Sequence, residues 1–449
     1  MGYIKRDLEK KLERWQQERN VIPLCIFGPR RVGKTTLCLN WIKQSFTHFA
    51  HLDFEKDNQV KHIFSQLSPD TMIDKLEQCY QISVTDKNTI LFLDHIDLFP
   101  RAIVAMHLLS KQNINCSILM TGNKQFFGFK KDYFEQFKSL YCGPVSFSEF
   151  LTYSQSENDE EAIHLNSLSI TSPPSESEHH FLMTVFNTYL SLGGLPSVIK
   201  NHCENNKFHK LIENNPGYKS FYFSKKTATI PIQDQHNAYY NLYQNELKKQ
   251  ASSLIQFDHD AQIIKSLPGI IGQKASKKKL NPKNPQYVDN SLKNIESIYF
   301  LTGIRGISQA DNISSTSSYK RYYFPDLSLL HSLYTSQLAS YNRTAPSTEQ
   351  YELLLKQFIF QELISLSSSS KVNFWFRDKK SSQAYIPFIN NDNTAIYLSN
   401  AAKPSYPSLR LFKQESNKNK AIIIANHPLK AIKQNLILPP YLISKITTI

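Results

Sequence analysis

Residues 28–35 read Gly-Pro-Arg-Arg-Val-Gly-Lys-Thr, and this stretch with its flanks decides the fold class. It matches the pattern G-x-x-x-x-G-K-[ST] of a phosphate-binding loop, whose glycines permit a tight turn with backbone N–H groups pointing at the phosphates. An apolar run suited to a buried strand precedes the loop at residues 22–27, and a helical pattern follows it at residues 36–42. Because strand, loop and helix come in this order, the helix N-terminus adds its dipole to the same anion site.

The loop predicts that the chain binds a nucleoside triphosphate, ATP, together with Mg²⁺. Lys34 is expected to place an ammonium group near the β and γ phosphate oxygens, and Thr35 to ligate Mg²⁺ through its hydroxyl. Arg30 and Arg31 have two interpretations: contact with a phosphate or a neighbouring subunit, or exposure at variable positions. The expected nucleotide-binding set is Gly28, Pro29, Arg30, Arg31, Val32, Gly33, Lys34, Thr35 and Thr36.

A second nucleotide motif stands at residues 90–94, which read Ile-Leu-Phe-Leu-Asp. Asp94 ends this apolar run where a Walker B carboxylate belongs, so it is expected to hold Mg²⁺ directly or through water. Many ATPases place Glu next to polarise the attacking water, but this chain has His95. A neutral imidazole can act as a base near pH 7, although its geometry differs from that of a carboxylate. The sequence therefore predicts nucleotide binding and leaves hydrolysis open.

The segment Thr121-Gly122-Asn123-Lys124 follows a fourth apolar run and has two interpretations. As a sensor beside the Walker B strand, Thr121 or Asn123 would hydrogen-bond the γ-phosphate or the attacking water. The alternative is a turn that simply ends the strand. A guanine-specificity motif would need Asp where Phe126 stands, so GTP is rejected.

The formal net charge of +14 is distributed unevenly along the 449 residues. Residues 186–449 carry 32 basic and 16 acidic side chains, whereas residues 151–185 carry six acidic and no basic ones. A basic second half is either an electrostatic footprint for nucleic acid or a set of ordinary solvated faces. DNA is one expected partner and a protein is the other, while the oligomeric state stays open.

The six cysteines have no C-x-x-C spacing, which predicts reduced thiols without disulfides or a zinc cluster. No signal-type N-terminus and no apolar run long enough to span a bilayer are present, so we expect a cytoplasmic protein without a membrane segment. His51, His62 and the pair His179-His180 lack metal-ligand spacing and are interpreted as surface or packing residues.

The periodicity predicts an α/β fold in three regions. The first, residues 1–180, alternates short apolar strands with helices, which implies a parallel sheet covered on both faces, and ends in an acidic linker at 152–180. The second, residues 181–310, is helical, and the third, residues 311–449, is an α/β domain with its own sheet. Expected strands lie at 22–27, 48–54, 89–96, 116–122, 372–376, 384–389, 395–399 and 421–426, and expected helices at 187–199, 237–255 and 351–366.

The ordered motifs resemble a known family, the prokaryotic P-loop ATPases with an AAA-type core, a winged-helix-like middle and a C-terminal restriction-endonuclease-like domain. The resemblance implies that the helix within residues 287–301 sits where a recognition helix would. It rests on YIKRDLEKKL (3–12), GPRRVGKTT (28–36), LFLDHIDLFP (91–100), ILMTGN (118–123), PVSFSEFL (144–151), YLSLGGLPSVI (189–199), SYKRYYFPDLSLL (318–330) and FIFQELI (358–364).

Three departures limit what the resemblance implies. His95 replaces the family's usual Glu, and the usual Arg before PVSFSEFL is missing from SLYCGPVSF, so both departures weaken the case for turnover. The family's nuclease-like domain shows E-V-D-F and E-V-K strands, whereas residues 383–386 and 399–401 here read QAYI and SNA. No acidic pair remains to hold a catalytic metal, so we expect this domain to be inactive as a nuclease.

These observations give three hypotheses. The leading one is an ATP-binding AAA-type protein, a slow ATPase at most, that couples nucleotide state to DNA or protein binding by its C-terminal half. The second is a nucleotide-binding scaffold without hydrolysis, which His95 and the missing Arg favour. A nuclease is the weakest hypothesis because its metal ligands are absent from the sequence.

Overall fold

The computed structural model divides into two compact units, which are described separately. Lys5–Cys142 form the N-terminal unit, and Gly143–Ile449 with the first four residues form the C-terminal unit. The structure describes residues 2–18, 22–66, 68–112, 114–123, 137–154, 164–165, 167–206, 232–251, 253–273, 276–308, 316–333, 348–366, 372–379, 382–390, 392, 394–399, 406–416, 421–432 and 435–448.

The N-terminal unit is built on a five-stranded sheet in the order β2-β3-β4-β1-β5. All neighbouring strands run parallel, so their carboxyl ends meet at one edge, which confirms the predicted parallel sheet. Strand β3 is buried along its whole length. The strands are β1 (Leu24–Phe27), β2 (His48–Asp53), β3 (Thr89–Asp94), β4 (Ser117–Gly122) and β5 (Lys138–Tyr141).

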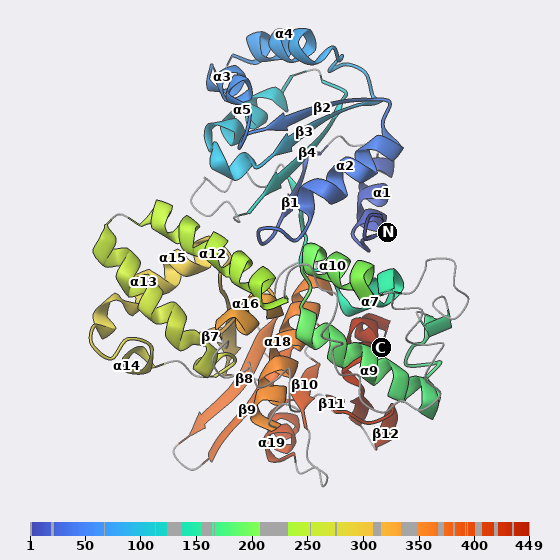
Figure 1. Ribbon diagram of the computed structural model, residues 1–449, viewed down its shortest axis with the longest axis vertical. Coiled ribbons are helices and arrows are strands. Elements are labelled where there is room, and N and C mark those ends of the chain that lie inside the picture. The colour runs from blue at the N-terminus through green and yellow to red at the C-terminus, as the bar shows by residue number, and fades with distance from the viewer. Residues whose placement is uncertain are drawn as a thin grey trace. The chain divides into compact units, whose positions relative to one another are not determined.

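Helices cover both faces of this sheet (Figure 1). One hydrophobic cluster joins alternate residues of β2, β3 and β4, such as Leu52, Leu93 and Met120, to α3, α4 and α5. On the other side, Trp15 of α1 and Trp41 of α2 lie with ring centroids 6.0 Å apart. The helices are α1 (Glu9–Gln17), α2 (Lys34–Ser45), α3 (Asn58–Ser65), α4 (Pro69–Tyr80) and α5 (Arg101–Leu109), with a short 3₁₀ turn η1 (Ile96–Leu98).

The C-terminal unit contains an eight-stranded mixed sheet in the order β12-β13-β11-β10-β9-β8-β6-β7. Its described strands are β6 (Thr302–Ile307), β7 (Thr316–Tyr323), β8 (Asn373–Lys379), β9 (Ser382–Ile389), β10 (Ala395–Leu398), β11 (Ala421–Ile424), β12 (Lys430–Ile432) and β13 (Asn435–Leu438). Its described helices are α7 (Phe147–Ser154), α9 (Glu176–Leu192), α10 (Pro196–Asn206), α12 (Ile232–Gln250), α13 (Leu254–Ser266), α14 (Lys277–Leu280), α15 (Val288–Ser297), α16 (Leu327–Leu333), α18 (Thr348–Leu366) and α19 (Pro407–Glu415), with 3₁₀ segments η2 (Leu267–Ile270), η3 (Pro285–Tyr287) and η4 (Pro440–Thr448).

Buried polar side chains join segments that are far apart in this unit. The carboxylate of Asp326 accepts a hydrogen bond of 2.7 Å from the backbone N–H of Gly194. Gln361 of α18 donates one of 2.7 Å to the hydroxyl of Tyr189 in α9. Buried hydrogen bonds therefore join parts of the chain before and after residue 310, and the division into domains at 181–310 and 311–449 stays a prediction.

The helices around residue 190 differ from the expected single helix at 187–199, because the chain breaks at Gly193. This residue has φ +74°, and a Cβ there would lie 2.5 Å from Ser328 Oγ, so only glycine fits. The expected linker at 152–180 is also helical at both ends, since α7 reaches Ser154 and α9 begins at Glu176. Ser175 and Glu178 form a capping box that starts α9, while residues 155–163 lie outside the described part.

Candidate functional site

The loop between β1 and α2 needs its two glycines for different reasons. A Cβ at Gly28 would lie 2.0 Å from the backbone oxygen of Cys142, because β5 ends directly beside the loop. Gly33 precedes the first residue of α2 with φ 95° and ψ 20°, a left-handed conformation that side chains disfavour. The backbone oxygen of Gly33 then accepts the first helical hydrogen bond, 2.9 Å from Leu37 N. These contacts aim the start of α2 at the carboxyl edge of the sheet.

Lys34 is buried at this edge and contacts neutral oxygens. Its Nζ donates hydrogen bonds to Gly28 O (3.0 Å), Pro29 O (2.7 Å) and Asn123 Oδ1 (2.8 Å). Burial lowers the pKa of Lys34 to about 8, since desolvation disfavours its charged form. None of these three acceptors is a carboxylate, and a buried cation in such surroundings is a fitting partner for an anion.

Asp94 ends β3 as a fully buried carboxylate beside Thr35, Thr121 and His51. Thr35 Oγ1 donates a hydrogen bond of 3.1 Å to Oδ1, and Thr121 Oγ1 donates a short one to the same oxygen. His51 Nε2 lies 3.4 Å from Oδ2. Burial alone would raise the pKa of Asp94, but the hydrogen bonds from these side chains and the nearby His95 hold it below its usual value. The structure thus brings together the expected metal ligands Thr35 and Asp94.

His95 follows β3 in a left-handed conformation, with φ 57° and ψ 40°. Its Nδ1 lies 3.1 Å from Asp53 Oδ1 and 3.5 Å from Asp94 Oδ2, while Nε2 lies 3.8 Å from Glu55 Oε2. Its backbone N–H donates a hydrogen bond of 3.2 Å to Thr121 Oγ1. The imidazole is therefore fixed among carboxylates, in a backbone conformation uncommon for residues other than glycine.

The two loop arginines lie in different surroundings. Arg30 is mostly buried, and its Nη1 lies 3.8 Å from Glu55 Oε1, whereas Arg31 is exposed with φ 60°. Val32 is buried and Thr36 is exposed. The Val32 backbone oxygen accepts a buried hydrogen bond of 2.9 Å from Arg6 Nη1. Arg6 is thus a loop-supporting residue that the phosphate-loop motif alone does not reveal.

His51, Asp53 and Glu55 form part of the site that motif spacing did not indicate. His51, interpreted from the sequence as a surface or packing residue, stacks on Phe92, and the pairing of β2 with β3 also brings its Nε2 within 3.4 Å of Asp94 Oδ2. Register places Asp53 opposite Asp94 at the carboxyl end of the sheet. The sequence did carry a signal for Asp53, because this carboxylate ends the second apolar run and the carboxyl ends of parallel strands meet at the same edge of a sheet.

The comparisons with known proteins agree with this geometry. Residues 21–151 match the family model described as an AAA domain, so the chain carries an AAA-type domain there, and this domain type implies nucleotide binding. A search of curated proteins found no match.

Solved structures that resemble the chain include a Walker-type ATPase and an AAA domain. The Walker-type ATPase PABY2304 of Pyrococcus abyssi has 11% identity and a TM-score of 0.42, over 74% of this chain and 96% of that one. PCH-2 of C. elegans has 16% identity and a TM-score of 0.22, over 33% and 43%. The FIGL-1 AAA domain has 12% identity and a TM-score of 0.23, over 36% and 59%. These identities and TM-scores are low, so the chemistry of the site is inferred from its own residues.

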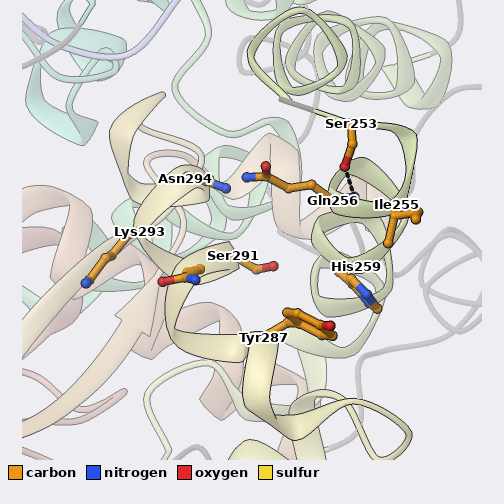
Figure 2. Close-up of a pocket in the computed structure, with 9 residues that line it drawn as sticks. Ser253, Ile255, Gln256, His259, Tyr287, Ser291, Lys293 and Asn294 are labelled. Carbon is orange, nitrogen blue, oxygen red and sulfur yellow. Dashed lines mark hydrogen bonds between the residues drawn. The ribbon is translucent and has the colours of Figure 1, made fainter.

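A hollow of about 390 Å³ lies in the C-terminal unit between α13 and α15. His259 stacks on Tyr287 with ring centroids 4.5 Å apart and 20° between the planes. Figure 2 shows Gln256 and Asn294 pointing toward one another across the hollow, with His259 over Tyr287. Tyr287 is 45% exposed, so an aromatic ring is available at this surface.

Two other expectations concern the C-terminal unit and the membrane. The resemblance matches residues 383–386 and 399–401 to the strands that carry the nuclease carboxylates in the family. The first segment lies in β9 and the second just after β10, with residues 400 and 401 outside the described part.

Among the helices that the structure describes, none is long and apolar enough to cross a membrane.

Proposed function

We propose that the N-terminal unit binds ATP with Mg²⁺ and acts as a switch whose hydrolysis is slow. The observation that carries this proposal is Lys34, a buried cation held by three neutral oxygens at the start of α2. A triphosphate would replace the loop carbonyls as the acceptor of its hydrogen bonds. ATP is preferred to GTP because Phe126 stands where a guanine-binding Asp would be needed.

The other loop residues have separate roles in this proposal. Backbone N–H groups of residues 30–33 bind phosphate oxygens, and the N-terminus of α2 adds its dipole. Thr35 and Asp94 are the side chains that would hold Mg²⁺, since hydroxyl and carboxylate oxygens are the ligands that this ion prefers. The ion would neutralise phosphate charge when bound. Asn123 Oδ1 accepts a hydrogen bond from Lys34 at the end of β4, and the sensor role expected for this residue would add a hydrogen bond to the γ-phosphate or the attacking water.

Slow hydrolysis follows from the surroundings of His95. His95 stands where many ATPases have the Glu that polarises the attacking water, and its imidazole differs in geometry from a carboxylate, with ring nitrogens 3.1 Å from Asp53 and 3.8 Å from Glu55. The usual Arg is also absent from the segment after β5. A binding switch that holds ATP for long periods is therefore favoured over an efficient ATPase.

One observation favours active hydrolysis as a second candidate. With a proton on Nδ1 shared with Asp53, His95 would keep Nε2 free to accept a proton from water. In that case His95→Asn abolishes phosphate release. In the switch model the same variant changes it little, and His95→Glu increases it.

For the C-terminal unit we propose binding of nucleic acid near α14 and α15, with a protein partner as the alternative. The proposal is supported by the exposed ring of Tyr287, which can stack on a base, and by the exposed ammonium groups of Lys278 and Lys279 nearby. Lys277 differs from them because it pairs with Asp289.

Calorimetric titration with Mg·ATP tests the primary proposal. The full chain is expected to bind one equivalent, and Lys34→Ala to lose at least tenfold in affinity. Lys43→Ala, at the far end of the same helix, is a matched control that should bind normally. Equal affinities for the Lys34 variant and the unaltered chain would exclude this site.

A further inference from the structure

We propose that His51, Asp53, Asp94 and His95 form a binding site for a transition-metal ion, of which Zn²⁺ is the best fit. The ligand atoms offered by His51, Asp53 and Asp94 all lie within 4.8 Å of one another. This set is distinct from the Thr35 and Asp94 oxygens proposed for Mg²⁺, because it adds imidazole nitrogens. Imidazole suits zinc, copper, iron and nickel, whereas Mg²⁺ prefers oxygen ligands.

Two of the distances between donor atoms fit a tetrahedral ion. Metal bonds of roughly 2.0–2.2 Å to His nitrogen and carboxylate oxygen place neighbouring ligand atoms roughly 3.3–3.6 Å apart. His51 Nε2 lies 3.4 Å from Asp94 Oδ2, and His95 Nδ1 lies 3.5 Å from the same oxygen. His95 Nδ1 lies 3.1 Å from Asp53 Oδ1. The ligand atoms of His51, Asp53 and Asp94 already lie within 4.8 Å of one another, and His95, which stands outside that group, would complete the set by turning its ring toward it.

The fold holds these donors in place without a ligand. Register pairs Asp53 with Asp94 and His51 with Phe92 on adjacent parallel strands. The imidazole of His51 stacks on Phe92, with centroids 5.0 Å apart and 13° between the planes, so its orientation is restricted. Ligands carried by rigid strands and supported by packing bind metal better than ligands on loops.

Charge and burial are also suitable. The two carboxylates balance a divalent ion, and the two imidazoles bind as neutral donors. The Asp94 side chain is fully buried, and those of Asp53 and His95 are 11% and 19% exposed. His51, at 30%, is the most exposed of the four and leaves a route for an ion to enter.

The transition-metal site goes beyond the proposed function, and it shares one carboxylate with the proposed Mg²⁺ site. Asp94 is shared with the Mg²⁺ role, so a transition-metal ion bound to the nucleotide-free chain competes with Mg·ATP. The state of the switch would then depend on the availability of this ion as well as on ATP.

Titration of the chelator-treated full chain with Co²⁺ tests the site, because Co²⁺ is a visible probe for tetrahedral zinc sites. We expect one equivalent to give the intense visible absorption of four-coordinate Co²⁺, and Zn²⁺ to displace it. His51→Gln should weaken binding at least tenfold. His62→Gln is the matched control, since His62 is exposed on α3 and its ring lies near Gln66.

Several outcomes would overturn the inference. These are absence of the absorption, equal Co²⁺ affinity in the His51 and His62 variants, or a thiolate charge-transfer band that disappears in Cys79→Ser, the exposed cysteine among those described. Failure of the metal site is separable from failure of the nucleotide proposal. Lys34→Ala should lose ATP binding and keep Co²⁺ binding, whereas a chain that binds Mg·ATP but no Co²⁺ retains only the proposed function.

Discussion

Lys34 of α2 donates a hydrogen bond of 2.8 Å to Asn123 at the end of β4, which joins the phosphate-binding loop to the strand beside Walker B. The contact links two residues 89 positions apart in sequence. It holds the ammonium group where the carboxyl ends of β1, β3 and β4 meet. The position of the Lys34 ammonium group is thus coupled to β4, the strand next to β3 and its terminal Asp94.

Removal of this contact should weaken nucleotide binding less than removal of the cation itself. We expect Asn123→Ala to reduce Mg·ATP affinity by about three- to tenfold, because a hydrogen bond to a charged group contributes roughly 1.5–3 kcal/mol and part is recovered from phosphate. Asn123→Asp places an anion beside Lys34 and should reduce affinity further. Calorimetry on both variants shows which of them loses more Mg·ATP affinity. An unchanged affinity in Asn123→Asp would contradict the contact between Lys34 and Asn123.

Thr121 is expected to stabilise the N-terminal unit through two contacts. Its hydroxyl donates to Asp94 and accepts from the His95 backbone N–H. Thr121→Val leaves both groups without this partner and should lower the free energy of unfolding by about 1–3 kcal/mol. Denaturant unfolding measures the loss, and Thr121→Ser, which keeps the hydroxyl, is the control. Equal stability of the Val and Ser variants would show that the hydroxyl contributes nothing.

Gly193→Ala should destabilise the C-terminal unit. The added Cβ would lie 2.5 Å from Ser328 Oγ and 2.9 Å from Asp326 Oδ1, in a backbone conformation that already disfavours a side chain. A loss of roughly 1–3 kcal/mol in the free energy of unfolding is expected. Gly269→Ala is the matched control, because a Cβ added there would meet no atom within 4 Å beyond its own chain neighbours. A similar effect of both substitutions would argue against the helix break described at Gly193.

Acid should destabilise the C-terminal unit through His236. The ring of His236 stacks on His331 at 5.2 Å and contacts Leu192 O at 2.9 Å. Burial lowers the pKa of His236 to about 3, while the unfolded chain has a value near 6.5. Between these values the unfolded state binds more protons, so stability falls as the pH decreases below about 6.5.

The size of this effect can be measured by comparison with His236→Gln. At pH 5 the unfolded chain gains roughly 2 kcal/mol from protonation of this histidine, a contribution that the variant lacks. The difference in unfolding free energy between the two proteins should therefore shrink by about that amount between pH 7 and pH 5. Parallel stability profiles would contradict the assignment.

Nucleic-acid binding should depend on Lys278 and Lys279 more than on Lys277. Replacement of the first two by Gln is expected to reduce the slope of log affinity against log salt by about 2, because each lysine releases about one counterion. Lys277→Gln should have a smaller effect, since its ammonium group pairs with Asp289. Mobility shifts over a salt series provide the test. Absence of any shift at low salt would leave the protein-partner alternative.

The sequence predicted the loop between β1 and α2 and the strand that ends at Asp94, because their spacing is dictated by local backbone geometry. It did not predict His51 or Asp53 as part of the site, because their proximity to Asp94 depends on which strand neighbours β3 and in which register. The helix expected across residues 187–199 failed for a similar reason. The conformation of Gly193 is set by Ser328 and Asp326, far away in sequence.

Strand β6 was missed because its glycines weaken the strand pattern. Gly303 and Gly306 lie where added side chains would meet Tyr322 of β7 and Phe374 or Phe376 of β8. Small residues are therefore needed for close packing, although glycine is unfavourable in strands. Tertiary packing overrides the local preference in this case.

The central claim, that the N-terminal unit is an ATP-binding switch with slow hydrolysis, is tested most directly by phosphate release at saturating Mg·ATP. The unaltered chain is expected to bind ATP and to release phosphate at least ~10²-fold more slowly than the ~10 s⁻¹ of a typical enzyme. His95→Glu should increase the rate. Rapid release by the unaltered chain, abolished in His95→Asn, would contradict the account and identify His95 as a catalytic base.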